Sequence, residues 1–231
     1  MGCFKKVRLQ QPLTHYTGSR KNMLQKICQA LFPPECLLCS HRTQRIEPIC
    51  KQCESLLPWL PRGCQTCAAP LLTNESRHCG QCISHPPDTD NTTCIFAYEQ
   101  PIKHWITQYK FNHQLHLIRL FSHWIKNQCQ ARSRHIDLII PVPIHARKLK
   151  QRGFNQCDLI GKDVAQYIQP PYSNKLLIKK KHTEPQITLS SKARLKNLQN
   201  SFAVKGDISN CRIAVIEDII TTGATVREIA K

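Results

Sequence analysis

The stretch "IAVIEDIITTGATV", residues 213–226, decides the fold of the second half of the chain. An apolar run ends in two adjacent acids, Glu217 and Asp218, and a turn rich in threonine and glycine follows them. Apolar residues in and after the turn have the spacing of a starting helix. The stretch therefore predicts a buried strand, an entry turn over residues 221–225, and a helix.

In an open parallel sheet, ligands bind beyond the carboxyl ends of the strands, where this acid pair is expected. Backbone N–H groups of such a turn, with hydroxyls beside them, hold phosphate groups. The two acids would repel an anion unless they meet hydroxyls or a metal. A sugar 5-phosphate satisfies both halves, because its ring hydroxyls can donate to Glu217 and Asp218. The residues expected to hold its phosphate are Thr221, Thr222, Gly223, Ala224 and Thr225.

Strand and helix patterns alternate upstream of this stretch. The predicted strands cover residues 94–99, 136–143, 175–180 and 211–219, and the predicted helices cover 101–111, 115–127 and 155–168. The run "IDLIIPVP" at 136–143 is apolar until its prolines, as in a strand buried on both faces of a parallel sheet. The alternation predicts an α/β domain with a mostly parallel sheet.

Two basic segments flank the predicted site. A loop directly after residues 136–143 carries Arg147, Lys148 and Arg152, which could meet a pyrophosphate. The polar, basic stretch at 183–204 could cover the site as a mobile segment. Solvated loops are the alternative for both segments, and an ordinary capped turn is the alternative for residues 221–225.

Eight of the fourteen cysteines form four C-x-x-C pairs. Two such pairs can supply the four thiolates of a tetrahedral structural zinc site, so the sequence predicts two Zn²⁺ ions. Pairing in chain order is the simplest assignment, crossed pairing stays open, and redox or disulfide pairs are the alternative. The predicted ligands are Cys36, Cys39, Cys50, Cys53, Cys64, Cys67, Cys79 and Cys82.

Composition bounds the partners and the size of the units. The 231 residues carry a formal net charge of +18, which favours nucleic acid or phosphorylated ligands. No uninterrupted apolar run approaches the ~20 residues of a membrane-spanning helix. We expect a cytoplasmic protein, either free or peripheral at the inner face of the membrane. The predicted division is a basic N-terminal extension with a lead-in helix at 1–34, a zinc module at 35–85 and the α/β domain at 94–231.

The segment "EDIITTGAT" at 217–225 resembles the phosphoribosyl pyrophosphate loop of the type I phosphoribosyltransferases. Together with the cysteine pairs, "PVPIHARKLKQRGFNQ", "YKFNHQLHLIRLF" and the stretch at 183–204, it resembles the ComF family of competence proteins and GntX-like relatives. The resemblance implies a double zinc ribbon joined to a type I phosphoribosyltransferase-like domain with helices on both faces of its sheet. It also implies phosphoribosyl pyrophosphate or a similar ligand with Mg²⁺, in proteins of DNA uptake during natural transformation, with DNA-uptake machinery as partner.

Two other functions stay open. One is an adaptor that binds single-stranded DNA through its zinc ribbon and basic surface and keeps only a vestigial pocket. The other is a nucleotide-salvage phosphoribosyltransferase, which would make the protein a glycosyltransferase. Related purine phosphoribosyltransferases carry an Asp where this chain has Thr221, so no base stands at that position and ligand binding is favoured over catalysis. Type I domains also continue further than "VREIAK", so the C-terminal helix and edge strand are expected to be short, either because the sequence is truncated or because this member has lost an edge of its sheet.

Overall fold

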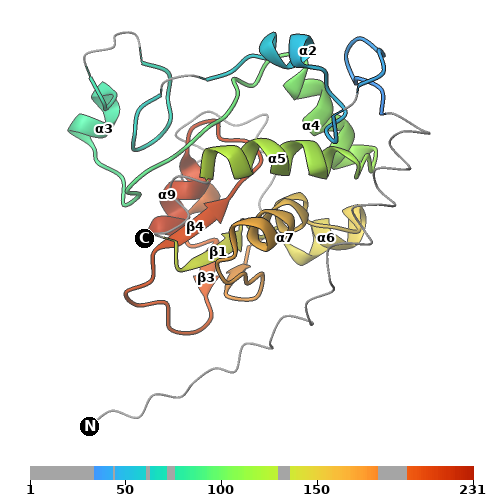
Figure 1. Ribbon diagram of the computed structural model, residues 1–231. Coiled ribbons are helices and arrows are strands. Elements are labelled where there is room, and N and C mark those ends of the chain that lie inside the picture. Colours follow the sequence, from blue (N-terminus) through green and yellow to red (C-terminus); the bar gives the residue numbers. More distant parts are fainter. Residues whose placement is uncertain (1–33, 44, 61–62, 72–75, 130–135, 182–196) are drawn as a thin grey trace. The chain divides into compact units, whose positions relative to one another are not determined.

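The computed structural model describes residues 34–231, apart from 44, 61–62, 72–75, 130–135 and 182–196 (Figure 1). Residues 1–33 of the predicted N-terminal extension, with the lead-in helix, lie outside this part of the chain. The described part of the chain forms two compact units, which divide between residues 53 and 54. The predicted limits of the zinc module at 35 and 85 remain predictions.

The first unit contains a tight knuckle around Cys36. The Cys36 N–H donates to the His41 carbonyl at 2.8 Å, and the Ser40 N–H donates to the Cys36 carbonyl at 2.9 Å. The turn passes through Ser40 in the left-handed region, at φ 60°. Ile49 is fully buried, and helix α2 (Lys51–Ser55) begins directly after Cys50.

The second unit begins with a knuckle that repeats this geometry. The Cys64 N–H donates to the Ala69 carbonyl at 2.8 Å, and the Ala68 N–H donates to the Cys64 carbonyl at 2.7 Å. Ala68 has φ 59°, and helix α3 (Gly80–Ser84) begins directly after Cys79. A Cβ atom on Gly63 would lie 2.6 Å from the Ala68 carbonyl oxygen, so this knuckle requires glycine at position 63.

The remainder of the second unit is an α/β domain. Its elements in chain order are α4 (Ile102–Phe111), α5 (Leu117–Cys129), β1 (Leu138–Pro141), α6 (Ala146–Arg152), α7 (Gln156–Ile168), β2 (Leu177–Lys179), β3 (Phe202–Val204), β4 (Ile213–Ile216) and α9 (Ala224–Ala230). Strands β1 and β4 pair in parallel, with Leu138 opposite Ile213 and Pro141 opposite Ile216. Strands β2 and β3 pair antiparallel, and Tyr172 forms a parallel bridge to Ile139 of β1.

Helices cover both faces of the β1–β4 pair. Helix α7 contacts both strands on one face, and α5 packs on α7 (Figure 1). The α7 backbone lies close to the sheet at Gly161, where an added Cβ would lie 3.0 Å from the Tyr172 ring. On the other face, Leu138 and Ile140 pack with Leu177 and with Ile229 of α9. The structure therefore confirms the predicted α/β class with its zinc-ribbon module.

Three local predictions differ from the structure. Residues 94–99 form a single antiparallel bridge, Trp59 to Phe96, because prolines at 58 and 61 limit the partner segment to a few residues. The predicted basic loop after β1 contains helix α6, whose first turn is capped by the His145 imidazole accepting from the Arg147 N–H. The predicted cover at 183–204 ends in strand β3, so its last residues belong to a sheet.

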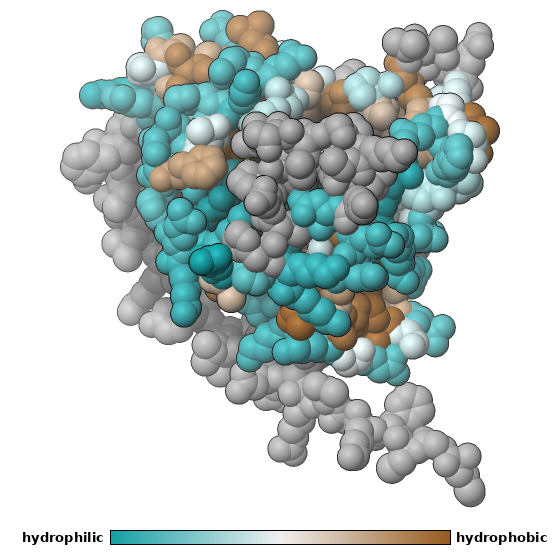
Figure 2. Space-filling view, turned by 180° about the vertical axis from the view of Figure 1, so that it is seen from behind, coloured by the Kyte–Doolittle hydropathy of each residue, from teal (hydrophilic) through white to brown (hydrophobic). Residues whose placement is uncertain are grey.

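Figure 2 shows a face that is mainly hydrophilic, with separate small hydrophobic patches. Within the part of the chain that the structure describes, no helix combines the length and the apolar character needed to cross a membrane.

Candidate functional site

The eight paired cysteines form two clusters in chain order. Cys36, Cys39, Cys50 and Cys53 form one, and Cys64, Cys67, Cys79 and Cys82 form the other. Within each cluster, all four sulfur atoms lie within 4.8 Å of one another. Crossed pairing of the knuckles is therefore excluded.

The sulfur positions fit a tetrahedral zinc ion. A Zn–S bond of about 2.3 Å places the sulfurs of a regular tetrahedron about 3.8 Å apart. The Sγ atoms of Cys39 and Cys50 are 3.8 Å apart, and those of Cys67 and Cys79 are 3.6 Å apart. Each cluster has the donor set and the spacing of a closed structural site with no position for a substrate.

Backbone hydrogen bonds stabilise the thiolate form of one cysteine in each cluster. Burial alone would raise the pKa of Cys36, but hydrogen bonds from the backbone N–H groups of Cys50, Cys39 and Leu38 lower it to about 6. The same arrangement lowers the pKa of Cys64 to about 6. Since the thiolate is the zinc ligand, these knuckles favour metal binding at neutral pH.

The acid pair lies directly after β4, as predicted. Glu217 Oε2 and Thr222 Oγ1 are both buried, and neither has a hydrogen-bond partner among the described residues. Burial and, to a smaller extent, the neighbouring Asp218 carboxylate raise the pKa of Glu217 to about 8, against a hydrogen bond from Thr225 and the charges of Lys110 and Lys179. A buried polar atom without a partner normally marks a place for water or a ligand.

Asp218 is held in a polar network that links three helices. Its Oδ2 atom accepts from Lys110 Nζ of α4 at 2.7 Å and from Gln156 Nε2 of α7 at 2.8 Å. The Gln156 Oε1 atom accepts in turn from Arg152 of α6. Tyr109 fixes α4 against α7, because its hydroxyl donates to the Gln156 carbonyl at 3.0 Å.

Four cations gather around these two acids. Burial and, to a smaller extent, the nearby charge of Lys148 lower the pKa of Lys179 to about 8. Burial also lowers the pKa of Lys148, and Arg152 and Lys110 add to that effect. Among the described residues, no carboxylate forms an ion pair with Lys148 or Lys179. The cluster therefore has an excess of positive charge that an anion would neutralise.

The turn after the acids follows the prediction in outline. Gly223 is in the left-handed region at φ 69°, which glycine adopts without strain, and α9 begins at Ala224. The Thr225 hydroxyl forms a hydrogen bond with the Glu217 carboxyl group. Thr222 Oγ1 is buried in the same turn. Thr221 is exposed. The first N–H groups of the helix lack intrahelical partners, as in any helix.

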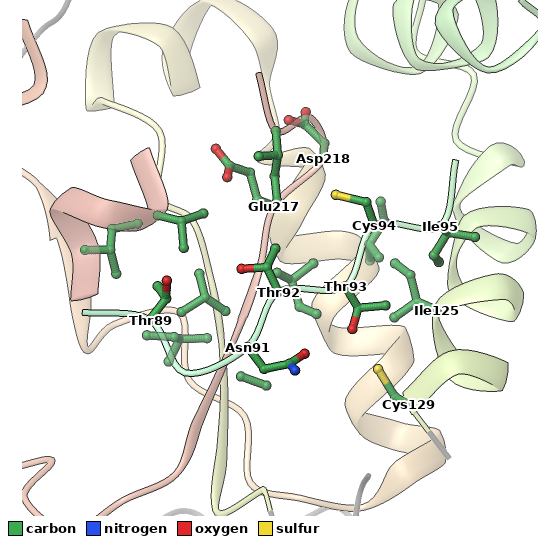
Figure 3. Close-up of a pocket in the computed structure, with 18 of the residues that line it drawn as sticks. Thr89, Asn91, Thr92, Thr93, Cys94, Ile95, Ile125, Cys129, Glu217 and Asp218 are labelled. Atoms are coloured by element: carbon green, nitrogen blue, oxygen red, sulfur yellow. The ribbon is translucent and has the colours of Figure 1, made fainter. Parts of the chain in front are cut away.

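A pocket of about 910 Å³ adjoins the acids. Glu217 and Asp218 lie at one end of it, and Thr89, Thr92 and Cys94 belong to the segment that forms a wall (Figure 3). Thr92 anchors this wall to the second ribbon, since its hydroxyl donates to the Thr66 carbonyl at 2.6 Å. The segment at 85–93, which joins the second ribbon to the α/β domain, is thus part of the site's surroundings. Strand β4 lines the pocket along the edge that pairs with no other described strand.

Sequence reasoning found some of these residues and missed others. It named Lys148 and Arg152, which the structure brings to the acids, and it named Arg147, which is exposed on α6 and has no described contact with them. It missed Lys110, Gln156 and Lys179. Lys110 and Gln156 lie within the quoted motifs "YKF" and "RGFNQ", but nothing in the local spacing shows that both reach Asp218.

The fold and the site together define the class of the protein. It is a double zinc ribbon joined to an α/β domain, in which two acids at the end of a strand lie beside a cluster of cations. A model of the double zinc ribbon domain matches residues 27–83. Competence protein F of Haemophilus influenzae is 31% identical over 191 residues, which cover 79% of this chain and 82% of that protein. The chain therefore belongs to the competence protein F (ComF) family.

Two further relatives agree with this membership. The DNA utilization protein YhgH of Escherichia coli is 26% identical over 201 residues, covering 85% of this chain and 82% of the relative. Competence protein ComFC of Streptococcus pneumoniae is 24% identical over 191 residues, covering 79% of this chain and 80% of the relative. The resemblance that the motifs indicated is confirmed.

Proposed function

We propose that the protein acts in DNA uptake and binds phosphoribosyl pyrophosphate, or a closely similar sugar phosphate with Mg²⁺, at the end of β4. The names of the relatives, competence protein and DNA utilization protein, support the cellular role. The observation that supports the ligand is the pairing of a buried, partnerless Glu217 oxygen with an adjacent excess of cations.

The two halves of the site suit the two ends of this ligand. A ribose ring carries hydroxyls that can donate to Glu217 Oε2 and Asp218, while Thr222 and Thr225 stand at the turn for its 5-phosphate. The pyrophosphate end requires positive charge, which Lys148, Arg152 and Lys179 offer. Mg²⁺ prefers oxygen ligands and accompanies phosphate groups, so it would enter with the ligand.

Binding is proposed without turnover. A transferase needs a group that moves a proton at the acceptor or an acceptor that needs none. Thr221 offers no such group, and Glu217 holds its proton to about pH 8 in the absence of ligand. Binding without turnover would let the protein respond to the presence of the ligand, or let the ligand stabilise the structure of the pocket.

A calorimetric panel tests the proposal on the zinc-loaded, full-length protein. Phosphoribosyl pyrophosphate with Mg²⁺ is expected to bind with one site per chain. Ribose 5-phosphate and pyrophosphate, which each present one half of the ligand, are expected to bind more weakly than the whole. Equal affinity for pyrophosphate and for the whole ligand would show an anion site without a sugar, and absence of binding would refute the proposal.

The cellular role has its own test. In a naturally transformable bacterium that lacks its family member, this chain is expected to restore transformation, and the variant Glu217→Gln/Asp218→Asn is expected to restore less. If both restore transformation equally, the pocket is not needed for DNA uptake.

A further inference from the structure

The geometry points to a second binding site in the α/β domain: we infer that the ring of Phe111 is a stacking site for a nucleobase of single-stranded DNA. Phe111 is the last residue of α4, and its side chain is 62% exposed. The choice of DNA as the source of the base rests on the proposed role in DNA uptake. The stacking chemistry rests on the described residues alone.

The ring is held next to a planar cation. The Arg152 guanidinium carbon lies 5.4 Å from the centroid of the Phe111 ring. Arg152 is itself fixed, because it donates to Gln156 Oε1, and Gln156 donates to Asp218. Lys110, the residue before Phe111, pairs with the same carboxylate at 2.7 Å. Two separate links therefore hold the ring and its cation in place before any ligand arrives.

The charge around the ring suits a phosphate backbone. Exposed Arg147 and Lys150 stand on α6, in the same short helix as Arg152. Single strands are bound by aromatic rings on which bases stack, set among cations that follow the phosphates. A guanidinium near the ring adds cation–π attraction and a phosphate donor in one group. A base on Phe111 would have phosphates within reach of this helix.

A second exposed aromatic ring of the domain shows what distinguishes Phe111. Tyr167 on α7 is 57% exposed, and Lys126 Nζ lies 5.2 Å from its ring centroid. Lys126, however, is neutralised by Asp163 at 2.7 Å. Tyr167 thus resembles Phe111 in exposure and in its cation but lacks the surplus positive charge. It is the matched control.

The test measures binding of labelled oligothymidylate to the zinc-loaded, full-length protein by fluorescence anisotropy. Phe111→Ala is expected to weaken binding about tenfold, the loss of one stacked base. The dependence of log affinity on log salt is expected to keep its slope, since no charge is removed. Tyr167→Ala is expected to stay within about twofold of the parent chain, and Phe111→Trp is expected to retain binding and to show fluorescence quenching by the oligomer.

An abasic strand of the same length separates base stacking from phosphate binding. The parent chain should bind it as weakly as Phe111→Ala binds oligothymidylate, and Phe111→Ala should cause no further loss on it. Equal affinities of parent and Phe111→Ala for oligothymidylate, or an equal loss on both strands, would overturn the inference. Competition by thymidine monophosphate as effective as that by the oligomer would overturn DNA as the source of the base.

Failure here is distinguishable from failure of the proposed sugar-phosphate site. Phe111→Ala is expected to bind phosphoribosyl pyrophosphate within about twofold of the parent chain, because the one proposed site residue that Phe111 contacts in the described structure, Arg152, stays held by its hydrogen bond to Gln156. Unchanged zinc content and circular dichroism would show that the variant is folded.

Discussion

The zinc ribbons and the α/β domain are held together by different forces. Each ribbon gathers four thiols around a shared centre and has few fully buried apolar side chains, such as Ile49 in the first. The α/β domain instead buries large aromatic side chains, among them Trp124 and Tyr109. In each ribbon, the four thiols fill the coordination positions of the metal and leave none for a ligand. In the α/β domain, the ends of the strands are accessible, and acids can stand there. Structural zinc therefore belongs to the ribbons, and the ligand binding that we propose belongs to the α/β domain.

Removing a zinc ligand is expected to have the largest effect. Cys64→Ser should abolish the second zinc site and unfold the second ribbon, because structural zinc sites supply the folding free energy of such modules. Metal analysis should fall from two zinc ions to one per chain. The pocket wall should loosen as well, since Thr92 is anchored to this ribbon.

Cys211→Ser is the matched control for this change. Cys211 is an exposed cysteine outside both clusters, and its replacement should leave two zinc ions bound. Retention of two zinc ions by Cys64→Ser would contradict the assignment.

Truncating the aromatic core tests the other side of the comparison. Trp124 is 2% exposed, contacts the rings of Phe96 and Trp105, and donates from Nε1 to Glu54. Trp124→Ala should lower the free energy of unfolding by about 3–5 kcal/mol, measured by urea denaturation. Zinc content should stay at two per chain, and a loss of zinc would show that core and ribbons do not form separate stabilising systems.

A single methyl group in the second ribbon should have a smaller effect. Gly63→Ala places a Cβ against the Ala68 carbonyl oxygen, so the knuckle must shift. We expect destabilisation of about 1–3 kcal/mol, typical of overpacking, and faster zinc release to a chelator. Gly80→Ala is the control, because a Cβ there meets nothing within 4 Å. Equal zinc release from both variants would argue against the tight knuckle.

Glu217 should make the stability of the α/β domain depend on pH. The unfolded carboxyl ionises near its ordinary pKa of 4.5, whereas the folded one holds its proton to about pH 8. Between these values the folded state binds more protons, so the contribution of Glu217 to stability is greatest below pH 4.5 and falls as the pH rises toward 8.

Glu217→Gln removes this titration. The difference in unfolding free energy between variant and parent should therefore increase in favour of the variant from pH 5 to pH 8, as urea denaturation can measure. Using the difference cancels the titration of the cysteines. A difference independent of pH would contradict the raised pKa.

Much of this architecture could be predicted from local sequence, and the reason is local chemistry. The C-x-x-C spacing specifies a metal knuckle, and the run ending at Glu217 specifies a strand with a polar end. Strand β3 was missed because its three residues have no period of their own and are fixed by pairing with β2. Helix α6 was missed because it is mostly basic and has no apolar face.

The network around Asp218 could not be predicted for a different reason. Lys110 and Gln156 precede Asp218 by 108 and 62 positions, and they lie on two different helices. A tertiary contact between α4 and α7, the hydrogen bond from Tyr109 to the Gln156 carbonyl, brings them together. The sequence contains these residues in its motifs, but their meeting point is a property of the tertiary fold.

The measurement that tests the central claim most directly is calorimetric titration of phosphoribosyl pyrophosphate with Mg²⁺ into three forms of the chain. The parent and Asp137→Asn should bind alike. Asp137 pairs with Arg212 on the surface, at the ends of β1 and β4 that lie away from the two acids. The isosteric variant Glu217→Gln/Asp218→Asn should lose at least about tenfold in affinity, since a hydrogen bond to a charged group such as the Asp218 carboxylate contributes about 1.5–3 kcal/mol. Equal binding by all three forms would contradict the assignment of the ligand site to the end of β4.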